Sequence, residues 1–126
     1  MHRSRLYGIF IDTPMEEAPA AARFWSAALG APAESAVGEE QFTMLTDALT
    51  DLAAGVQAVG DSPRYHVDIE TDNVHAEVAR LSALGAVQVS RWLDCHVLRA
   101  PGGHLLCVIP MHSAPELFAA RARIWA

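Results

Sequence analysis

The feature of this sequence that most constrains its fold is a pattern that occurs twice. In each half a short strand-like segment, at 6–12 or 65–71, precedes a helix-like segment that ends in Leu-Gly-Ala. The glycine of that ending, Gly30 or Gly85, stands where a left-handed residue closes a helix. Two similar helices in one matching order predict two copies of a single structural unit.

Three strand-like pieces follow each helix and complete the repeat. They lie at about 33–37, 41–46 and 52–59 in the first half, and at about 86–90, 92–99 and 104–110 in the second. We therefore predict an α+β domain over 1–126, made of strand–helix–three strands in tandem, with helices near 17–29 and 73–84. Module one spans about 5–60 and module two about 64–111, and hairpin-connected strands rule against a doubly wound parallel sheet.

The C-terminal segment predicts one more helix, at about 114–125. Ser113 and Glu116 have the spacing of a capping box at its start. Its apolar side chains share a face that is too apolar to lie in water alone; they are Leu117, Phe118, Ile124 and Trp125. We expect this face either to fold back over a sheet or to contribute to a homodimer.

Composition excludes several classes of partner. The chain is 52% hydrophobic, carries a formal net charge of −6 and has no run of basic residues, so nucleic acid is a poor candidate. No apolar stretch approaches the roughly 20 residues that cross a bilayer, and the N-terminal run is too short for a signal peptide, so we expect a cytoplasmic protein. Cys95 and Cys107 lack CxxC spacing, which argues against a zinc knuckle or a redox pair.

Three stretches of the chain resemble one known family. "YHVDIETDNVHAEVARLSALGA", "FWSAALGA" and "APGGHLLCVIP" look like the glyoxalase/bleomycin resistance/dioxygenase superfamily, the vicinal oxygen chelate proteins. The resemblance covers about 6–111. It implies paired βαβββ modules whose curved mixed sheets enclose a cleft for a small molecule, and it favours a homodimer. In metal-using members, a histidine or carboxylate from each of four strands faces that cleft.

The four positions implied by the resemblance are poorly filled here. The first falls near Gly8, where no ligand type occurs, and the second offers only Gln57. The third is His66, a full match, and the fourth carries Cys107 where a carboxylate is usual. A hard ion such as Mg²⁺ or Mn²⁺ prefers several oxygen ligands. We therefore expect no catalytic metal at the usual place.

Strand alternation places His66 on the polar face of its strand. Tyr65, Val67 and Ile69 form the apolar face that meets the helices, while Asp68 shares the side of His66. That polar face is either a solvated sheet surface or a cleft floor that hydrogen-bonds a ligand. Trp92 is likewise either a wall of the cleft or a packed rim.

A third candidate cluster depends on the turn at "APGG". A two-residue turn at Pro101-Gly102 would place His96 opposite Cys107, and the topology of the family would set Cys107 beside His66. Such a row is either a small thiol between two hydrogen-bonded histidines, or a thiolate that acts as nucleophile or soft-metal ligand. In the second case Zn²⁺ suits it better than Mg²⁺.

These residues predict a small-molecule binding protein without the usual catalytic metal. No catalytic residue is assigned, and the candidate ligand-binding residues are His66, Asp68, Gln57, Cys107, His96 and Trp92. The alternative is a lyase, isomerase or dioxygenase that uses His66 with an atypical metal, or with Cys107 and His96. A third class, a structural or interaction domain, would fill the cleft with its own side chains, and fold alone does not separate the three.

Overall fold

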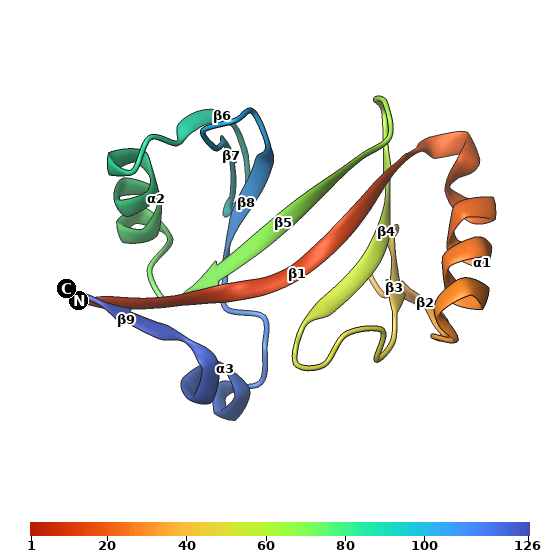
Figure 1. Ribbon diagram of the computed structural model, residues 1–126, viewed down its shortest axis with the longest axis horizontal. Coiled ribbons are helices and arrows are strands. Elements are labelled where there is room, and N and C mark those ends of the chain that lie inside the picture. Colours follow the sequence, from red (N-terminus) through yellow and green to blue (C-terminus); the bar gives the residue numbers. More distant parts are fainter. The chain divides into compact units, whose positions relative to one another are not determined.

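The computed structural model describes all 126 residues, which form two compact units. One unit is Gly8–His66, and the other joins Met1–Tyr7 to Val67–Ala126. Two strands, β1 (His2–Pro14) and β5 (Arg64–Thr71), take part in both units because each boundary falls inside one of them (Figure 1). No helix of the chain is long and apolar enough to cross a membrane.

The unit Gly8–His66 has the order strand, helix, three strands. Its elements after β1 are η1 (Met15–Glu17), α1 (Ala18–Leu29), β2 (Ala33–Ala36), β3 (Glu39–Leu45) and β4 (Ala53–Val59). The strands hydrogen-bond in the order β2-β3-β4-β1, with β1 and β4 parallel and the other pairs antiparallel. Gly30 ends α1 in the left-handed conformation, at φ 64°, as its position in Leu-Gly-Ala predicts.

The second unit repeats this order. After β5 come α2 (Val74–Ala83), β6 (Val87–Trp92), β7 (Cys95–Arg99) and β8 (Leu105–Pro110), with β5 and β8 parallel and the other pairs antiparallel. Asn73 caps α2, because its side-chain oxygen accepts the backbone N–H of Ala76 at 3.0 Å. The prediction of an α+β chain with two βαβββ modules is confirmed.

Alternation along β5 and β8 builds the core beneath α2. Leu98, Leu106 and Val108 are buried, and Val67 and Ile69 of β5 pack against them. The remaining members of this cluster are Val74, Val78, Leu81, Ala86 and Ala100. The faces of β5 therefore alternate as predicted for Val67 and Ile69, which leaves the side of His66 and Asp68 facing away from the α2 core.

Three apolar residues on these elements are exposed, among them Tyr65, which was expected on the apolar face of its strand. Phe24 of α1 is 62% exposed, and Ala22 is the buried residue of that helix. Leu84 and Tyr65 are 66% and 64% exposed. Leu84 stands at the C-terminal cap of α2, and Tyr65 near the start of β5, so both lie at element ends beyond the packed stripe.

The C-terminal segment folds back onto the same unit. A short helix, α3 (Pro115–Arg121), is followed by β9 (Arg123–Trp125), which pairs antiparallel with the start of β1 and brings the two termini together (Figure 1). Phe118 is fully buried, but Ile124 is 65% exposed, so only part of the predicted apolar face is covered. The single helix at 114–125 is wrong, because the chain becomes extended after Arg121.

The predicted capping box at Ser113 is also wrong. Ala114 occupies the N-cap of α3 and makes no side-chain bond there. The Ser113 hydroxyl donates instead to the carboxylate of Glu70, and the Ser113 and His112 backbone N–H groups donate to Glu70 Oε1 at 2.8 Å each. A buried carboxylate from a distant strand therefore takes the hydroxyl that the local pattern assigned to the helix.

Candidate functional site

His66 lies on β5 and is nearly buried. Its ring nitrogen Nδ1 lies 2.8 Å from Oδ2 of Asp12 on β1, in the same compact unit. The two side chains are 7% and 3% exposed. The family resemblance implied a first functional position near Gly8, and the predicted site residues did not include Asp12, which is four residues further along the strand. The period of two along β1 puts Gly8, Phe10 and Asp12 on one face, and that signal could have found it.

The surroundings of the Asp12–His66 pair fix the imidazole ring. The Phe10 ring stacks on it, with centroids 5.3 Å apart and planes inclined by 14°. Phe42 in turn meets Phe10 edge-on at 5.7 Å. Arg64 Nε lies 3.3 Å from Asp12 Oδ2, so a positive charge lies beside the carboxylate. The ring is therefore held by a hydrogen bond in its plane and by an aromatic face against it.

Two glycines shape the surroundings of the Asp12–His66 pair. Gly55 makes room for the Phe10 ring, and Gly8 stands where the family resemblance implied a first ligand. A Cβ on Gly55 would lie 3.3 Å from the Phe10 ring, so the glycine leaves room for that ring. A Cβ on Gly8 would lie 2.6 Å from the carbonyl oxygen of Ala53, a distance that real side chains do not show. The missing ligand near Gly8 thus follows from the close approach of β1 and β4.

Gln57, predicted as a ligand-binding residue, lies beside Asp12. The parallel register of β1 and β4 pairs Asp12 with Gln57, and the antiparallel register of β3 and β4 pairs Gln57 with Phe42. Its side chain is half-buried. The unit Gly8–His66 therefore brings an amide next to the carboxylate that bonds His66.

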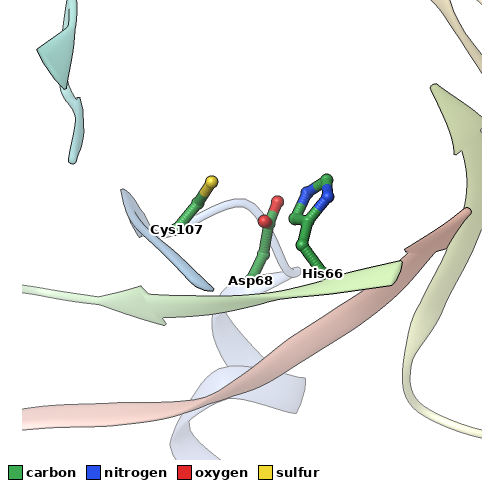
Figure 2. Close-up of side chains that lie close together, drawn as sticks. All are labelled: His66, Asp68 and Cys107. Carbon is green, nitrogen blue, oxygen red and sulfur yellow. The ribbon is translucent and has the colours of Figure 1, made fainter. Parts of the chain in front are cut away.

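Asp68 and Cys107 are neighbours across β5 and β8. Their backbones pair in the parallel register, so the two side chains share a face. Together with His66 they form the His66–Asp68–Cys107 group, in which one ligand atom from each residue lies within 4.8 Å of the others. Figure 2 shows the three side chains on the same side of these strands. His66 and Cys107 are close, as predicted, but the register sets Cys107 opposite Asp68, which stands between them in the view.

The predicted row that added His96 is wrong. The β7–β8 register pairs Val97 with Cys107 and His96 with Val108, a residue of the α2 core. The turn is one residue longer than predicted, since Gly102 and Gly103 both have positive φ and Ala100 N–H donates to the His104 carbonyl at 2.8 Å. One extra residue turns His96 to the opposite face.

Trp92 lies at the end of the edge strand β6. It pairs with Cys95, whose side chain alternates with Val97 and so shares the face of Cys107. The indole is 60% exposed. Trp92 is thus two strands away from Cys107 on the same face, and it is not a packed rim residue.

The polar face of β5 is buried. His66 and Asp68 are 7% and 8% exposed, and Glu70 is fully covered. This excludes the alternative of a solvated sheet surface. Glu70 is engaged by the backbone and hydroxyl groups before α3 and by Arg5, whose Nε lies 3.6 Å from it. Of the acids on this face, Glu70 has a structural role, and Asp68 is the one that joins His66 and Cys107.

The donor atoms of the His66–Asp68–Cys107 group decide which metal ion this chain could hold. Imidazole nitrogen, carboxylate oxygen and thiolate sulfur are the donor types of Zn²⁺, which catalytic sites hold with three protein ligands. Mg²⁺ needs an oxygen shell that one carboxylate does not supply. The residues present therefore fit Zn²⁺ and do not fit Mg²⁺ or Mn²⁺.

The sequence of residues 8–109 matches the family described as glyoxalase-like domain. This match spans most of the chain. The chain belongs to the glyoxalase-like domain family. No curated protein matches it.

Several solved structures resemble the glyoxalase-like chain in fold. Methylmalonyl-CoA epimerase from Mycobacterium tuberculosis is 16% identical with a TM-score of 0.59, over 90% of this chain and 91% of that one. A glyoxalase/bleomycin resistance protein/dioxygenase superfamily member from Vibrio splendidus is 13% identical with a TM-score of 0.56, over 86% and 99%. A 2,2',3-trihydroxybiphenyl 1,2-dioxygenase from Sphingomonas wittichii is 10% identical with a TM-score of 0.57, over 92% and 44%. Identities this low carry the fold and leave the activity to the site itself.

Proposed function

We propose that this glyoxalase-like protein binds a small polar molecule at the His66–Asp68–Cys107 group without a catalytic metal. The observation that carries the proposal is the burial of His66 and Asp68 on a sheet face that lies away from the α2 core. Polar groups that converge on one place, as His66, Asp68 and Cys107 do, are typical of ligand sites.

The chemistry of the group indicates what kind of molecule would bind. Asp68 offers carboxylate oxygens that accept hydrogen bonds, His66 offers a ring nitrogen, and Cys107 offers a polarisable sulfur. A carboxylate favours a ligand that presents N–H, O–H or cationic groups over an anionic one. The net charge of −6 of the whole chain supports the same preference.

A thermal-shift screen of polar metabolites and drug-like cations, with calorimetry on each hit, tests the proposal. We expect at least one hit whose affinity falls about tenfold or more in Asp68→Asn and His66→Gln, which corresponds to the loss of about 1.4 kcal/mol. Asp94→Asn and His75→Gln are matched controls, because both residues are exposed and lie outside the group. Hits that bind all four variants equally would contradict the proposal.

A second candidate function rests on the donor set. A zinc ion bound by His66, Asp68 and Cys107 would supply a Lewis acid for a lyase, isomerase or dioxygenase reaction. The residues of this chain would then hold the ion and exclude water, since His66 and Asp68 are buried. Metal analysis of protein purified without chelators separates the two candidates: the binder carries well under one equivalent of zinc, and the zinc enzyme carries one.

We also propose that the protein forms a homodimer. The edge strand β6 supports this, because Val87, Val89 and Trp92 are exposed along it, and an apolar edge strand is a surface that natural proteins tend to cover. Sedimentation velocity is the test. A monomer at all concentrations would contradict the proposal.

A further inference from the structure

Asp12 and His66 form a pair that the sequence motifs do not indicate. The residues are 54 positions apart and lie on different strands, yet Nδ1 of His66 is 2.8 Å from Oδ2 of Asp12. Both side chains are more than nine-tenths buried. A hydrogen bond to a charged group is stronger than one between neutral groups, so this contact constrains the ring strongly.

The contact decides which nitrogen of His66 carries a proton. An ionised carboxylate only accepts hydrogen bonds, so Nδ1 must be the donor. Arg64, with Nε 3.3 Å from Asp12 Oδ2, places a positive charge beside the carboxylate. When the imidazole is neutral, its lone pair then lies on Nε2, the nitrogen that is not bonded to Asp12.

Phe10 removes the remaining freedom of the ring. Its own ring is 2% exposed and lies nearly parallel to the imidazole. Phe42 packs edge-on against Phe10, and Gly55 leaves the space that Phe10 occupies. The aromatic stack blocks rotation about the side-chain bond, and the hydrogen bond to Asp12 blocks a flip of the ring.

We propose that Asp12 is a positioning residue that holds His66 with its proton on Nδ1 and directs Nε2 to the ligand. The proposal rests on the function assigned above, because it specifies how His66 meets the bound molecule. Nε2 then accepts a hydrogen bond from an N–H or O–H group of the ligand, or donates its lone pair to zinc. A carboxylate behind a histidine is a recurrent way to fix the tautomer of a functional imidazole.

Nitrogen-detected NMR of ¹⁵N-histidine-labelled protein tests the proposal without any ligand. At about pH 9, where histidines are neutral, we expect His66 to show a protonated Nδ1 and a bare Nε2, with the signal assigned by its absence in His66→Gln. Asp12→Ala should replace this signature with a mixture of tautomers or the reverse one. A bare Nδ1 in the wild type, or an unchanged signature in Asp12→Ala, would overturn the proposal.

Two further variants keep the test independent of stability. Asp12→Asn keeps the volume of the side chain but offers an amide, so it should also disturb the tautomer if Asp12→Ala does not fold. Asp61→Asn is the matched control, since Asp61 bonds the far side of Arg64 at 2.9 Å and does not touch His66. It should leave the signature unchanged, and a change as large as that of Asp12→Asn would assign the effect to Arg64.

The ligand screen and the tautomer measurement distinguish a failure of the proposed function from a failure of the proposed role of Asp12. If the wild type shows the Nδ1–H form but no screened molecule depends on Asp68 or His66, the function is wrong and the tautomer assignment stands. If a ligand depends on His66 while Asp12→Asn changes neither the tautomer nor the affinity, the function stands and Asp12 has no positioning role.

Discussion

The buried pairs His2–Glu77 and His66–Asp12 differ in how many hydrogen bonds the carboxylate receives. His2 Nε2 lies 2.7 Å from Glu77 Oε1, nearly the same distance as in the Asp12–His66 pair. Glu77 also receives two hydrogen bonds from Arg80, at 2.8 Å each. Asp12, by contrast, has one oxygen, Oδ1, that is buried and receives no hydrogen bond.

The saturated pair is a structural joint. The Arg80 guanidinium that binds Glu77 stacks on the Trp125 ring at 3.8 Å, and the indole N–H of Trp125 donates to the Ser4 hydroxyl at 2.8 Å. One carboxylate thus ties α2, the start of β1 and the C-terminal strand β9 together. Asp12 joins fewer partners and faces His66, a member of the candidate site. The two carboxylates therefore differ in that Glu77 is satisfied by groups that join three elements, whereas one oxygen of Asp12 receives no hydrogen bond.

Removing Glu77 should have the largest effect on stability. Glu77→Ala leaves Arg80 and His2 without their buried partner, so we expect the free energy of unfolding to fall by about 3 kcal/mol or more. Asp12→Ala should cost less, about 2 kcal/mol, because it breaks one charge-assisted hydrogen bond and one contact with the partly exposed Arg64. Urea denaturation of both variants measures this, and a greater loss in Asp12→Ala would reverse the comparison.

The stability of the protein at low pH should depend on Glu77. Burial alone would raise the pKa of Glu77, but hydrogen bonds from Arg80, Ser4 and His2 outweigh it and lower the pKa from 4.5 to about 2. A carboxyl whose pKa is lower in the folded state contributes stability above its unfolded pKa. That contribution, of about 3 kcal/mol, is lost as the pH falls from about 4.5 to about 2.

Urea denaturation between pH 6 and pH 2 checks this prediction. Between about pH 4.5 and pH 2 the free energy of unfolding should fall less steeply in Glu77→Gln than in the wild type, because the variant lacks one of the carboxyls that titrate there. Equal slopes for the wild type and Glu77→Gln would contradict the low pKa of Glu77.

Added metal ions should have a smaller effect on stability, and only through the group that contains His66. We expect Mg²⁺ and Mn²⁺ to leave the melting temperature unchanged, because the His66–Asp68–Cys107 group offers one carboxylate. Zn²⁺ is the ion with matching donors, so any stabilisation by it should disappear in His66→Gln and persist in His2→Gln. Stoichiometric Mg²⁺ bound through His66 would contradict the account of the donor set.

The smallest expected effect is on ligand affinity, in variants on the two faces of the β7–β8 hairpin. Cys107→Ser should weaken binding of a screened ligand by severalfold, since Cys107 lies with Asp68 in the candidate group. His96→Gln should leave binding unchanged, because His96 pairs with Val108 on the opposite face. Calorimetry on both variants decides, and a larger loss in His96→Gln would mean that the register differs.

Sequence reasoning recovered the fold because the evidence for it is local. The Leu-Gly-Ala endings and the period of two along β5 each involve residues that are close together in the sequence. Asp68 beside His66 follows from the same alternation, and Cys107 beside Asp68 follows from the parallel β5–β8 pairing of a βαβββ module. These parts of the candidate site were predictable once the module was recognised.

The parts that sequence reasoning missed depend on long-range register. Asp12 meets His66 only because of how β1 and β5 align, which no local pattern specifies. His96 turned away because Gly103 extended the turn by one residue. The Ser113 hydroxyl, predicted to cap the C-terminal helix, instead donates to the carboxylate of Glu70, 43 positions earlier. In each case one tertiary contact or one loop residue overrides a pattern that was locally sound.

A crystal structure of protein purified without added metal or chelator tests the central claim most directly. The account predicts that density for a bound polar molecule, or for the hit from the screen after soaking, contacts His66 Nε2 and the Asp68 carboxylate, with Asp12 still bonded to Nδ1. It would be contradicted if the hit bound elsewhere in the molecule, without contact to His66, Asp68 or Cys107.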